Sequence, residues 1–507
     1  FTLLVTIFMA SGIQFLIIDD DMMKMLPNNL KSKITWEAVQ NEFGSTEIIF
    51  IAYGNKGESI YNSRALSDLW VLSNALVNLS TVKKVSNIST SYRIDQIDGF
   101  MDVGDLQKSQ NLSNEEIERI EYYLRKNDNI KKQYVSQSND YLLTTVHPYD
   151  VGGLDQFRNE VVELSKSVLA DYDIHFGGTA YVTGSIPGMI RDDVQSLVKT
   201  GLLIMIIVLL MNLRSIPAVG MVLVVIVFSL LAMMGFMGWA YKFTGSDKFL
   251  FALLSTSMPI ILLTIANSDG VHVMTKFFRE IRNDKNVDNA IASSMDALLT
   301  PIFLTSITTV GAFLTLSTSP LEPLVGYGIS ISVGIVWACL LSSFTLPALI
   351  KLKDWDLMSK AIIDSSIFER IMEKLSEIVV KAPKTVLTFG TLIIVFGLAG
   401  LHKVDVDVNV SSFFKEGTEI RDSMDFIDRE MSGTMDLRVR IEGDIKDPTV
   451  LKSMDSLQVF IEQNEKISVS FSVADVVKQM HRAVMDDSLK YETIPEEREK
   501  INNLFTA

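Results

Sequence analysis

The sequence predicts a polytopic α-helical membrane protein with α/β domains outside the membrane. Three observations predict this fold class. The 507 residues have a positive mean hydropathy of +0.26. The apolar residues concentrate in blocks close to the ~20 residues that an α-helix needs to cross a hydrocarbon core. Long polar stretches that alternate helix and strand patterns separate these blocks.

Seven apolar blocks are candidate transmembrane helices. They cover residues 1–18, 197–213, 217–240, 249–275, 299–317, 325–350 and 385–401. One set of loops holds many lysines and arginines, above all in segments 276–285 and 351–384, whereas the short loops opposite hold only Lys242 and Lys248. Because cytoplasmic loops carry an excess of positive residues, we expect the first set in the cytoplasm.

Domain boundaries follow from this orientation. We expect a first span at 1–18, an extracytoplasmic α/β domain at 19–195, five spans within 196–350, a cytoplasmic linker at 351–383, a span at 384–402 and the start of a second outside domain at 403–507. In the linker, Ile367, Ile371, Leu375 and Val379 fall on one helical face. This pattern fits an interfacial amphipathic helix or an ordinary soluble linker helix.

The first outside segment alternates helix and strand patterns. Strands are predicted at 46–54, 82–90, 140–149 and 174–184, and helices at 32–43, 63–79, 113–126 and 153–172. This order predicts small α/β sandwiches of the ferredoxin-like type. Residues 185–201 are expected to continue as one helix into the second span.

An internal repeat relates the two outside segments. At an offset of 388, residues 36–54 fall on residues 424–442, and the apolar blocks before them also superpose. One span and the start of an outside domain therefore occur twice. A complete second copy would bring the protein to twelve spans, so we expect this chain to be a piece of a longer protein.

Composition narrows the function classes. The formal charge of −15 argues against a nucleic-acid partner. Cys339 is the single cysteine, so no disulfide can form within the chain, which fits a bacterial or archaeal envelope protein of the cell inner membrane. No metal-ligand spacing, nucleotide-binding loop or nucleophile elbow occurs, so we expect no enzyme, catalytic residue, cofactor or metal. The energy source would then be an ion gradient.

Asp269 is the residue that points to a mechanism. It is the only formal charge between Phe249 and Thr275. An ionised carboxylate at bilayer depth costs about 2.5–3.5 kcal/mol, and burial disfavours the charged form. Such a carboxyl group can gain a proton on one side of the membrane and release it on the other. The alternative is a structural Asp, paired with a neighbouring helix or hydrated near Lys276.

Polar neighbours could assist Asp269. His272 lies three residues further along the same helical face and is either a second proton carrier or a neutral packing residue. Gly270 allows a neighbouring helix to come close. In the next span, hydroxyl groups either bond back to their own helix carbonyls or face Asp269. The candidates for this second role are Thr305, Ser306 and Thr309.

Two stretches resemble a known family. "SDGVHVMTKFFREI" is similar to the fourth span of the hydrophobe and lipid exporter branch of the resistance–nodulation–division (RND) superfamily, and "PIFLTSITTVGAFLTLSTSPLEPLVGYG" is similar to its fifth span. The block 197–350 also resembles the sterol-sensing domain of Patched-type relatives. The resemblance covers essentially the whole chain and implies the RND fold, here its first half and part of its second.

The resemblance also implies roles. Asp269 would carry protons, and segments 20–195 and 403–507 would be porter domains that pass substrate outward. Gly270 stands where the lipid-exporter pattern has Tyr, which puts a Tyr-assisted relay in doubt. The family's partner motif in the tenth span lies beyond this chain.

We therefore expect a proton-driven exporter of hydrophobic or amphipathic molecules, including lipids, that meets membrane lipids and protons. It could form a homo-oligomer or bind periplasmic partner proteins. One alternative is a non-pumping lipid-binding or sterol-binding receptor or envelope assembly factor on the same fold. A further alternative is a protein-export accessory of the SecDF type. Fold alone decides none of these.

Overall fold

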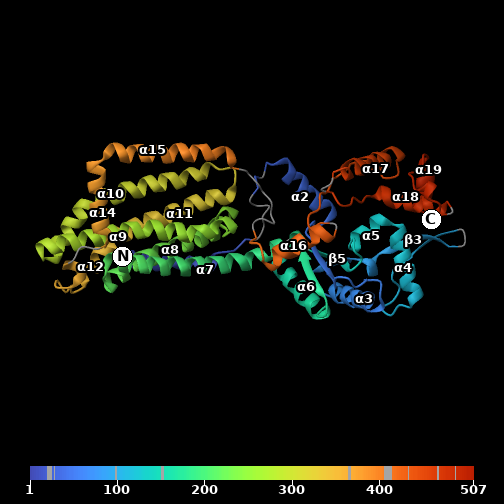
Figure 1. The fold of residues 1–507 in the computed structure, drawn as a ribbon, viewed down its shortest axis with the longest axis horizontal. Coiled ribbons are helices and arrows are strands. Elements are labelled where there is room, and N and C mark those ends of the chain that lie inside the picture. Colours follow the sequence, from blue (N-terminus) through green and yellow to red (C-terminus); the bar gives the residue numbers. More distant parts are fainter. Residues whose placement is uncertain are drawn as a thin grey trace. The chain divides into compact units, whose positions relative to one another are not determined.

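The structure is a computed structural model of the chain. It describes residues 1–19, 26–27, 29–97, 100–149, 153–363, 367–404, 414–431, 433–464, 467–485 and 487–506. The chain forms two compact units (Figure 1). The helical unit comprises Phe1–Ile34 and Ile186–Asp407, and the α/β unit comprises Thr35–Ser185 and Val408–Ala507.

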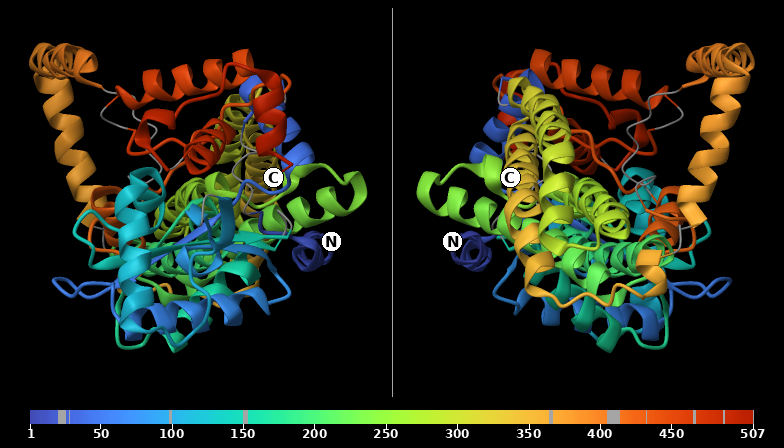
Figure 2. Two further views of the ribbon diagram at one scale, coloured as in Figure 1. Left: turned by 90° about the vertical axis from the view of Figure 1, so that its right-hand side faces the viewer. Right: turned by 90° about the vertical axis from the view of Figure 1, so that its left-hand side faces the viewer.

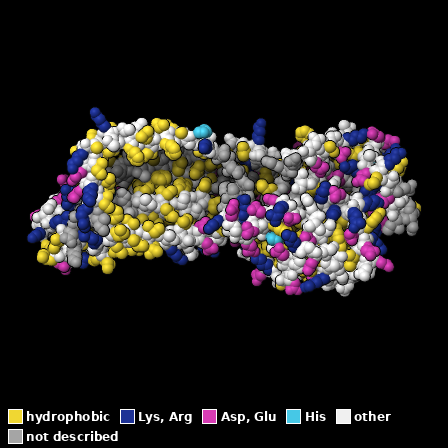
Figure 3. All heavy atoms as spheres, viewed as in Figure 1, with side chains coloured by type: hydrophobic (Ala, Val, Ile, Leu, Met, Phe, Trp, Pro, Cys, Tyr) yellow, Lys and Arg dark blue, Asp and Glu magenta, His cyan; other side chains and the backbone are white. Residues whose placement is uncertain are grey.

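Five of the described helices are long and apolar enough to cross a membrane. They are α7 (Thr179–Leu213), α8 (Ile216–Thr244), α10 (Val287–Leu314), α11 (Glu322–Leu340, continued by the π-helix η7 Leu341–Thr345 and by α12 Leu346–Leu352) and α15 (Pro383–Gly400). Each corresponds to one of the seven predicted spans. Hydrophobic side chains cover much of this unit's surface, as a lipid-facing surface requires (Figure 3).

The other two predicted spans differ from expectation. At the amino end, α1 (Thr2–Ala10) passes into a 3-10 turn, η1 (Ser11–Phe15), so the apolar helix is shorter than the predicted 1–18. The chain then becomes extended, and Ile18 bridges to Phe251. This bridge takes the place of a further helical turn.

The predicted span 249–275 begins later and ends later than expected. Residues before Met258 form two 3-10 turns, η4 (Asp247–Phe249) and η5 (Leu253–Ser257), and α9 then runs over Met258–Asp284. Pro259 favours a helix start at this point because it lacks the N–H that the first turn leaves unbonded. Although α9 has 27 residues, it is not among the five apolar helices, since polar side chains near its middle lower its hydropathy.

Helix α9 lies at the centre of the helical unit and packs against α8, α10 and α11. Its buried side chains Leu263, Ala266 and Phe277 join a core shared with α8. By contrast, no side chain of α15 is buried. Figure 2 shows α15 standing clear of α8–α11, with α14 leading to it.

The predicted linker contains helices. They are α12, α13 (Lys360–Ile363) and α14 (Ile367–Lys381). On α14 the apolar residues Ile371, Leu375 and Val379 are exposed, and they leave one face of the helix uncovered. The side chain of Ile367 lies outside the described part.

The α/β unit is built on a four-stranded sheet. Its strands are β1 (Ile49–Gly54), β2 (Val82–Ser86), β5 (Tyr141–Pro148) and β6 (Asp173–Gly177), in the order β2-β5-β1-β6 with every neighbouring pair antiparallel. Helices α3 (Ser63–Val77) and α6 (Leu154–Val168) connect β1 to β2 and β5 to β6. Both helices pack on the sheet face that carries Ile49, Ile51 and Tyr53. Helices α4 (Asn114–Lys126) and α5 (Asp128–Tyr134) complete this part.

Two parts of this unit differ from the sequence patterns. The strand predicted at 174–184 ends at Gly177, and α7 starts at Thr179. Gly178 separates the two elements with φ of +92°, a left-handed conformation that glycine adopts readily and that breaks a strand. A β-hairpin that the patterns do not predict, β3 (Tyr92–Ile97) with β4 (Phe100–Asp105), forms a separate two-stranded sheet.

The second face of the four-stranded sheet is covered by α16 (Glu419–Glu430). The Phe426 ring stacks on His175 with centroids 3.7 Å apart, and Ile427 packs with Ala52 and Leu143. The offset of 388 carries α2 (Lys31–Phe43) onto α16, so the helical part of the repeat is present.

The strand that the repeat predicts after α16 is absent from the described chain. Residues 437–442, which correspond to β1, form no strand in the described chain. Helices follow instead: α17 (Pro448–Glu462), α18 (Val473–Val484) and α19 (Arg498–Leu504), which pack around Leu451, Val477 and Ile501.

Candidate functional site

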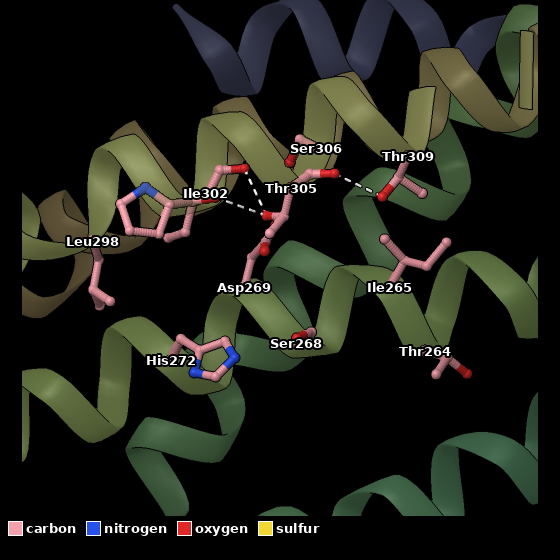
Figure 4. A pocket seen from close by; sticks show the side chains of 11 residues that line it. Thr264, Ile265, Ser268, Asp269, His272, Leu298, Ile302, Thr305, Ser306 and Thr309 are labelled. Atoms are coloured by element: carbon pink, nitrogen blue, oxygen red, sulfur yellow. Dashed lines mark hydrogen bonds between the residues drawn. The ribbon is translucent and has the colours of Figure 1, made fainter. Parts of the chain in front are cut away.

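The site is centred on Asp269, near the middle of α9. Its side chain is only 7% exposed and points from α9 toward α10 (Figure 4). The polar run around it is part of a continuous helix, because residues 258–284 keep helical geometry through Asn267, Ser268 and Gly270. The helix thus holds a carboxyl group against a neighbouring span.

Ser306 of α10 is the hydroxyl residue that faces Asp269. It is also 7% exposed, and its side chain lies beside the Asp269 carboxyl group in the same cavity. A hydroxyl can donate to a carboxylate or accept from a protonated carboxyl group. Ser306 can therefore serve Asp269 in either protonation state.

The neighbouring threonines behave differently. Thr305 donates to the carbonyl oxygens of Pro301 and Ile302, each at 3.0 Å, and Thr309 donates to the Thr305 carbonyl at 2.6 Å (Figure 4). Thr308 likewise donates to the Leu304 carbonyl at 2.9 Å. Of the two sequence interpretations, bonding back to the helix therefore describes the threonines. Among the described hydroxyl residues of α10, Ser306 is the one that interacts with Asp269.

A cavity of about 450 Å³ joins these groups. Asp269, Ser306, Thr305, Thr309 and His272 all line it, so the structure brings the five predicted residues together. Apolar side chains of α9 and α10 complete its wall; these are Ile265, Leu298 and Ile302. Among the described residues that line the cavity, Asp269 supplies the one carboxyl group, and hydroxyls, His272 and apolar side chains surround it.

His272 lines the cavity without a direct bond to Asp269. Its side chain is exposed, and its ring makes no hydrogen bond to any described residue. A transfer between His272 and Asp269 would therefore pass through water. Asn267, which the sequence places next to the site, does not line the cavity, and its side-chain oxygen is buried without a partner in the described structure.

Gly270 faces away from this cavity, toward α8. A Cβ atom built on Gly270 would lie 3.0 Å from Cγ1 of Val222, closer than ordinary contact. The close helix approach expected from the sequence is thus present. A tyrosine at this position would point into α8 rather than toward Asp269.

The helical unit contains a second cavity that the sequence patterns did not predict. It measures about 760 Å³ and lies between the second half of α9 and the first half of α14. His272 lines both cavities. A polar helix face that could have indicated this cavity is visible in the sequence, since Thr275, Arg279 and Asn283 continue the polar face of α9 at helical spacing. What the sequence did not reveal is that α14 forms the opposite wall.

Comparison with known proteins agrees with this architecture. Residues 78–402, well over half of the chain, match the MMPL family. A protein of Methanocaldococcus jannaschii with the name "Putative membrane protein MJ1562" is 23% identical over 346 residues, which cover 66% of this chain and 84% of that protein. The chain belongs to the MMPL family of RND-type membrane transporters.

Proposed function

We propose that this transporter is an exporter of hydrophobic or amphipathic molecules, lipids among them, that is driven by the proton-motive force, with Asp269 as the proton carrier. The observation that carries the proposal is the buried Asp269 carboxyl group on a membrane helix, opposite Ser306. An ionised carboxylate there costs about 2.5–3.5 kcal/mol, so proton uptake and release change the energy of this helix pair substantially.

The membrane potential supplies energy of the same order. One elementary charge that crosses 100 mV is worth about 2.3 kcal/mol. The charged and the neutral form of the Asp269 carboxyl group would therefore each favour its own packing of α9 against α10. His272 would pass protons to Asp269 through water, and Ser306 would orient the carboxyl group. Thr305 and Thr309 would provide a polar cavity wall, since their hydroxyls are already bonded to the backbone.

The soluble parts fit a porter role. The strand order β2-β5-β1-β6, with α3 and α6 as connections, is that of a split βαβ domain, which supports assigning residues 19–195 to a ferredoxin-like porter domain. Residues 403–507 would begin a second one. We place both outside the cell inner membrane because Lys and Arg gather in the opposite loops. In this orientation α14 lies in the cytoplasmic interface with its exposed apolar face in the lipid.

The test is proton flux through liposomes that contain the full-length protein. An imposed pH gradient should drive flux in the wild type, and Asp269→Asn should abolish it while the unfolding temperature stays the same. Asp296→Asn is the matched control, because Asp296 is exposed on α10 and does not line the cavity. Equal flux in all three folded proteins would contradict Asp269 as the proton carrier, and no flux in any of them would favour the non-pumping lipid-binding receptor.

A further inference from the structure

The second cavity has the chemistry of an anion site. From α9 it is lined by His272, Thr275, Arg279 and Arg282, and from α14 by Glu373. Two guanidinium groups therefore face a single carboxylate. Figure 3 shows Lys and Arg side chains gathered at the end of the helical unit where α12 and α14 lie. Asp and Glu side chains lie among them, and within the cavity lining the positive charges outnumber the single carboxylate.

Two donors in this cavity have no partner. Arg279 forms no ion pair or hydrogen bond with any described residue, although Glu373 lines the same cavity. The Thr275 hydroxyl is buried and likewise has no partner in the described structure. Arg282, by contrast, has a hydrogen-bond partner, because its Nε donates to the Ile362 carbonyl at 2.6 Å. An unpartnered buried hydroxyl costs about 1–3 kcal/mol. Because this hydroxyl is shielded from solvent, the Thr275 side chain must rotate toward the cavity for a ligand to accept from it and recover that cost.

The walls of the cavity suit an amphiphile. Phe368 and Met372 line it from α14, and Val271 lines it from α9. Met372 is 55% exposed, so the apolar wall continues onto the uncovered face of α14. A ligand here would meet cationic donors at one end and a hydrocarbon-like surface at the other.

We propose that this cavity binds the phosphate headgroup of an anionic membrane phospholipid. The Arg279 guanidinium and the Thr275 hydroxyl donate to the phosphate oxygens, since the guanidinium fork matches phosphate geometry. The acyl chains leave along Met372 into the bilayer. A basic pocket between a membrane helix and an interfacial helix is a recognised setting for acidic headgroups. Because His272 lines both cavities, the headgroup lies beside the candidate proton site, but its binding does not depend on proton transport.

The test is thermal unfolding of the full chain in detergent with added short-chain phosphatidylglycerol. This lipid should raise the unfolding temperature in a saturable way, whereas phosphatidylcholine of the same chain length and inorganic phosphate should have little effect. Arg279→Gln should weaken the apparent affinity about tenfold, the loss expected for one charge-assisted hydrogen bond. Thr275→Val, which keeps the side-chain shape, should weaken it less. Arg370→Gln, an exposed arginine of α14 that does not line the cavity, is the matched control.

Two results would overturn the proposal. If Arg279→Gln and Arg370→Gln reduce the affinity equally, the lipid is held only by the general charge of this surface. If inorganic phosphate stabilises the protein as well as the lipid does, the cavity is a free-anion site. Flux through Asp269 enters neither result, so failure of the transport proposal and failure of this one are distinguishable.

Discussion

Replacing Gly270 by tyrosine should destabilise the protein rather than improve it. The lipid-exporter pattern that this stretch resembles has Tyr at this position, so Gly270→Tyr introduces the residue of that pattern. The structure, however, directs the new side chain at α8, where even a Cβ atom would lie 3.0 Å from Val222 Cγ1. Optimal carbon contacts lie at about 3.5–4.0 Å. Overpacking of a tight helix interface costs about 1–3 kcal/mol, and a full phenol ring belongs at the upper end of that range or beyond it.

The effects of smaller substitutions at Gly270 and at Val222 should follow from the same short contact. Gly270→Ala adds the crowded Cβ atom but gains up to ~1 kcal/mol of helix propensity, so its net effect should be within about 1 kcal/mol of zero. Val222→Ala removes the two methyl groups that crowd position 270. The cost of Gly270→Tyr should therefore fall by about 0.5–3 kcal/mol in that background.

The assay is reversible unfolding of the four variants in mixed detergent micelles, together with proton flux in liposomes. The reasoning is refuted if Gly270→Tyr is as stable as the wild type and raises Asp269-dependent flux. That result would mean that residue 270 faces the cavity, and the Asp-Tyr pair of the family would then be within reach of this chain.

Three further predictions concern other parts of the chain. Ser306→Ala should reduce proton flux far more than Thr305→Val, measured in the same liposomes, because the Thr305 hydroxyl is already bonded to its own helix; equal losses would contradict the assignment of Ser306. Arg482 is fully buried and donates to Asn127 at 2.7 Å and to Glu492 at 3.0 Å. Because the Glu492 side chain is 42% exposed and stays hydrated when its partner is lost, Arg482→Met should cost about 1–3 kcal/mol in a denaturant titration, and no cost at all would contradict these bonds. Burial, with the nearby charges Lys84 and Arg438, lowers the pKa of His147 to about 4, so the unfolded chain binds more protons than the fold between about pH 6.5 and 4. The unfolding temperature should therefore fall as pH drops through this window, and His147→Gln should flatten the change; an unchanged slope would exclude His147 as its source.

The sequence predicts the parts of the fold that depend on local pattern. Apolar blocks locate five of the spans, and helical spacing locates α14 and the continuous α7. The candidate site follows from two simple rules: a charge in an apolar block is costly, and residues three or four apart share a helix face. These rules place Asp269 and His272 on one face and give Thr305, Ser306 and Thr309 as candidates on the next span.

What the sequence did not predict depends on contacts between distant residues. A glycine in a left-handed conformation ends β6 at Gly177, and no apolar period reveals this. The covering of the sheet by α16 depends on Phe426 and Ile427, which lie some 250 residues from β6 in the chain. The threonine hydroxyls of α10 could have bonded either to carbonyl oxygens of their own helix or to Asp269, and the sequence does not distinguish these two partners. The second cavity requires α14 beside α9, an arrangement that no local pattern encodes.

The central claim is that the Asp269 carboxyl group gains and loses a proton. Infrared difference spectroscopy of the full-length protein in lipid, recorded while the pH is varied, measures this directly through the C=O stretch of a protonated carboxyl group. Because the chain has 61 Asp and Glu residues, the carboxyl band is a sum of many groups, and we predict one titrating component that the wild type and Asp296→Asn share and that Asp269→Asn lacks. A band of undiminished intensity in folded Asp269→Asn would contradict the claim and leave Asp269 as a structural residue of the α9–α10 interface.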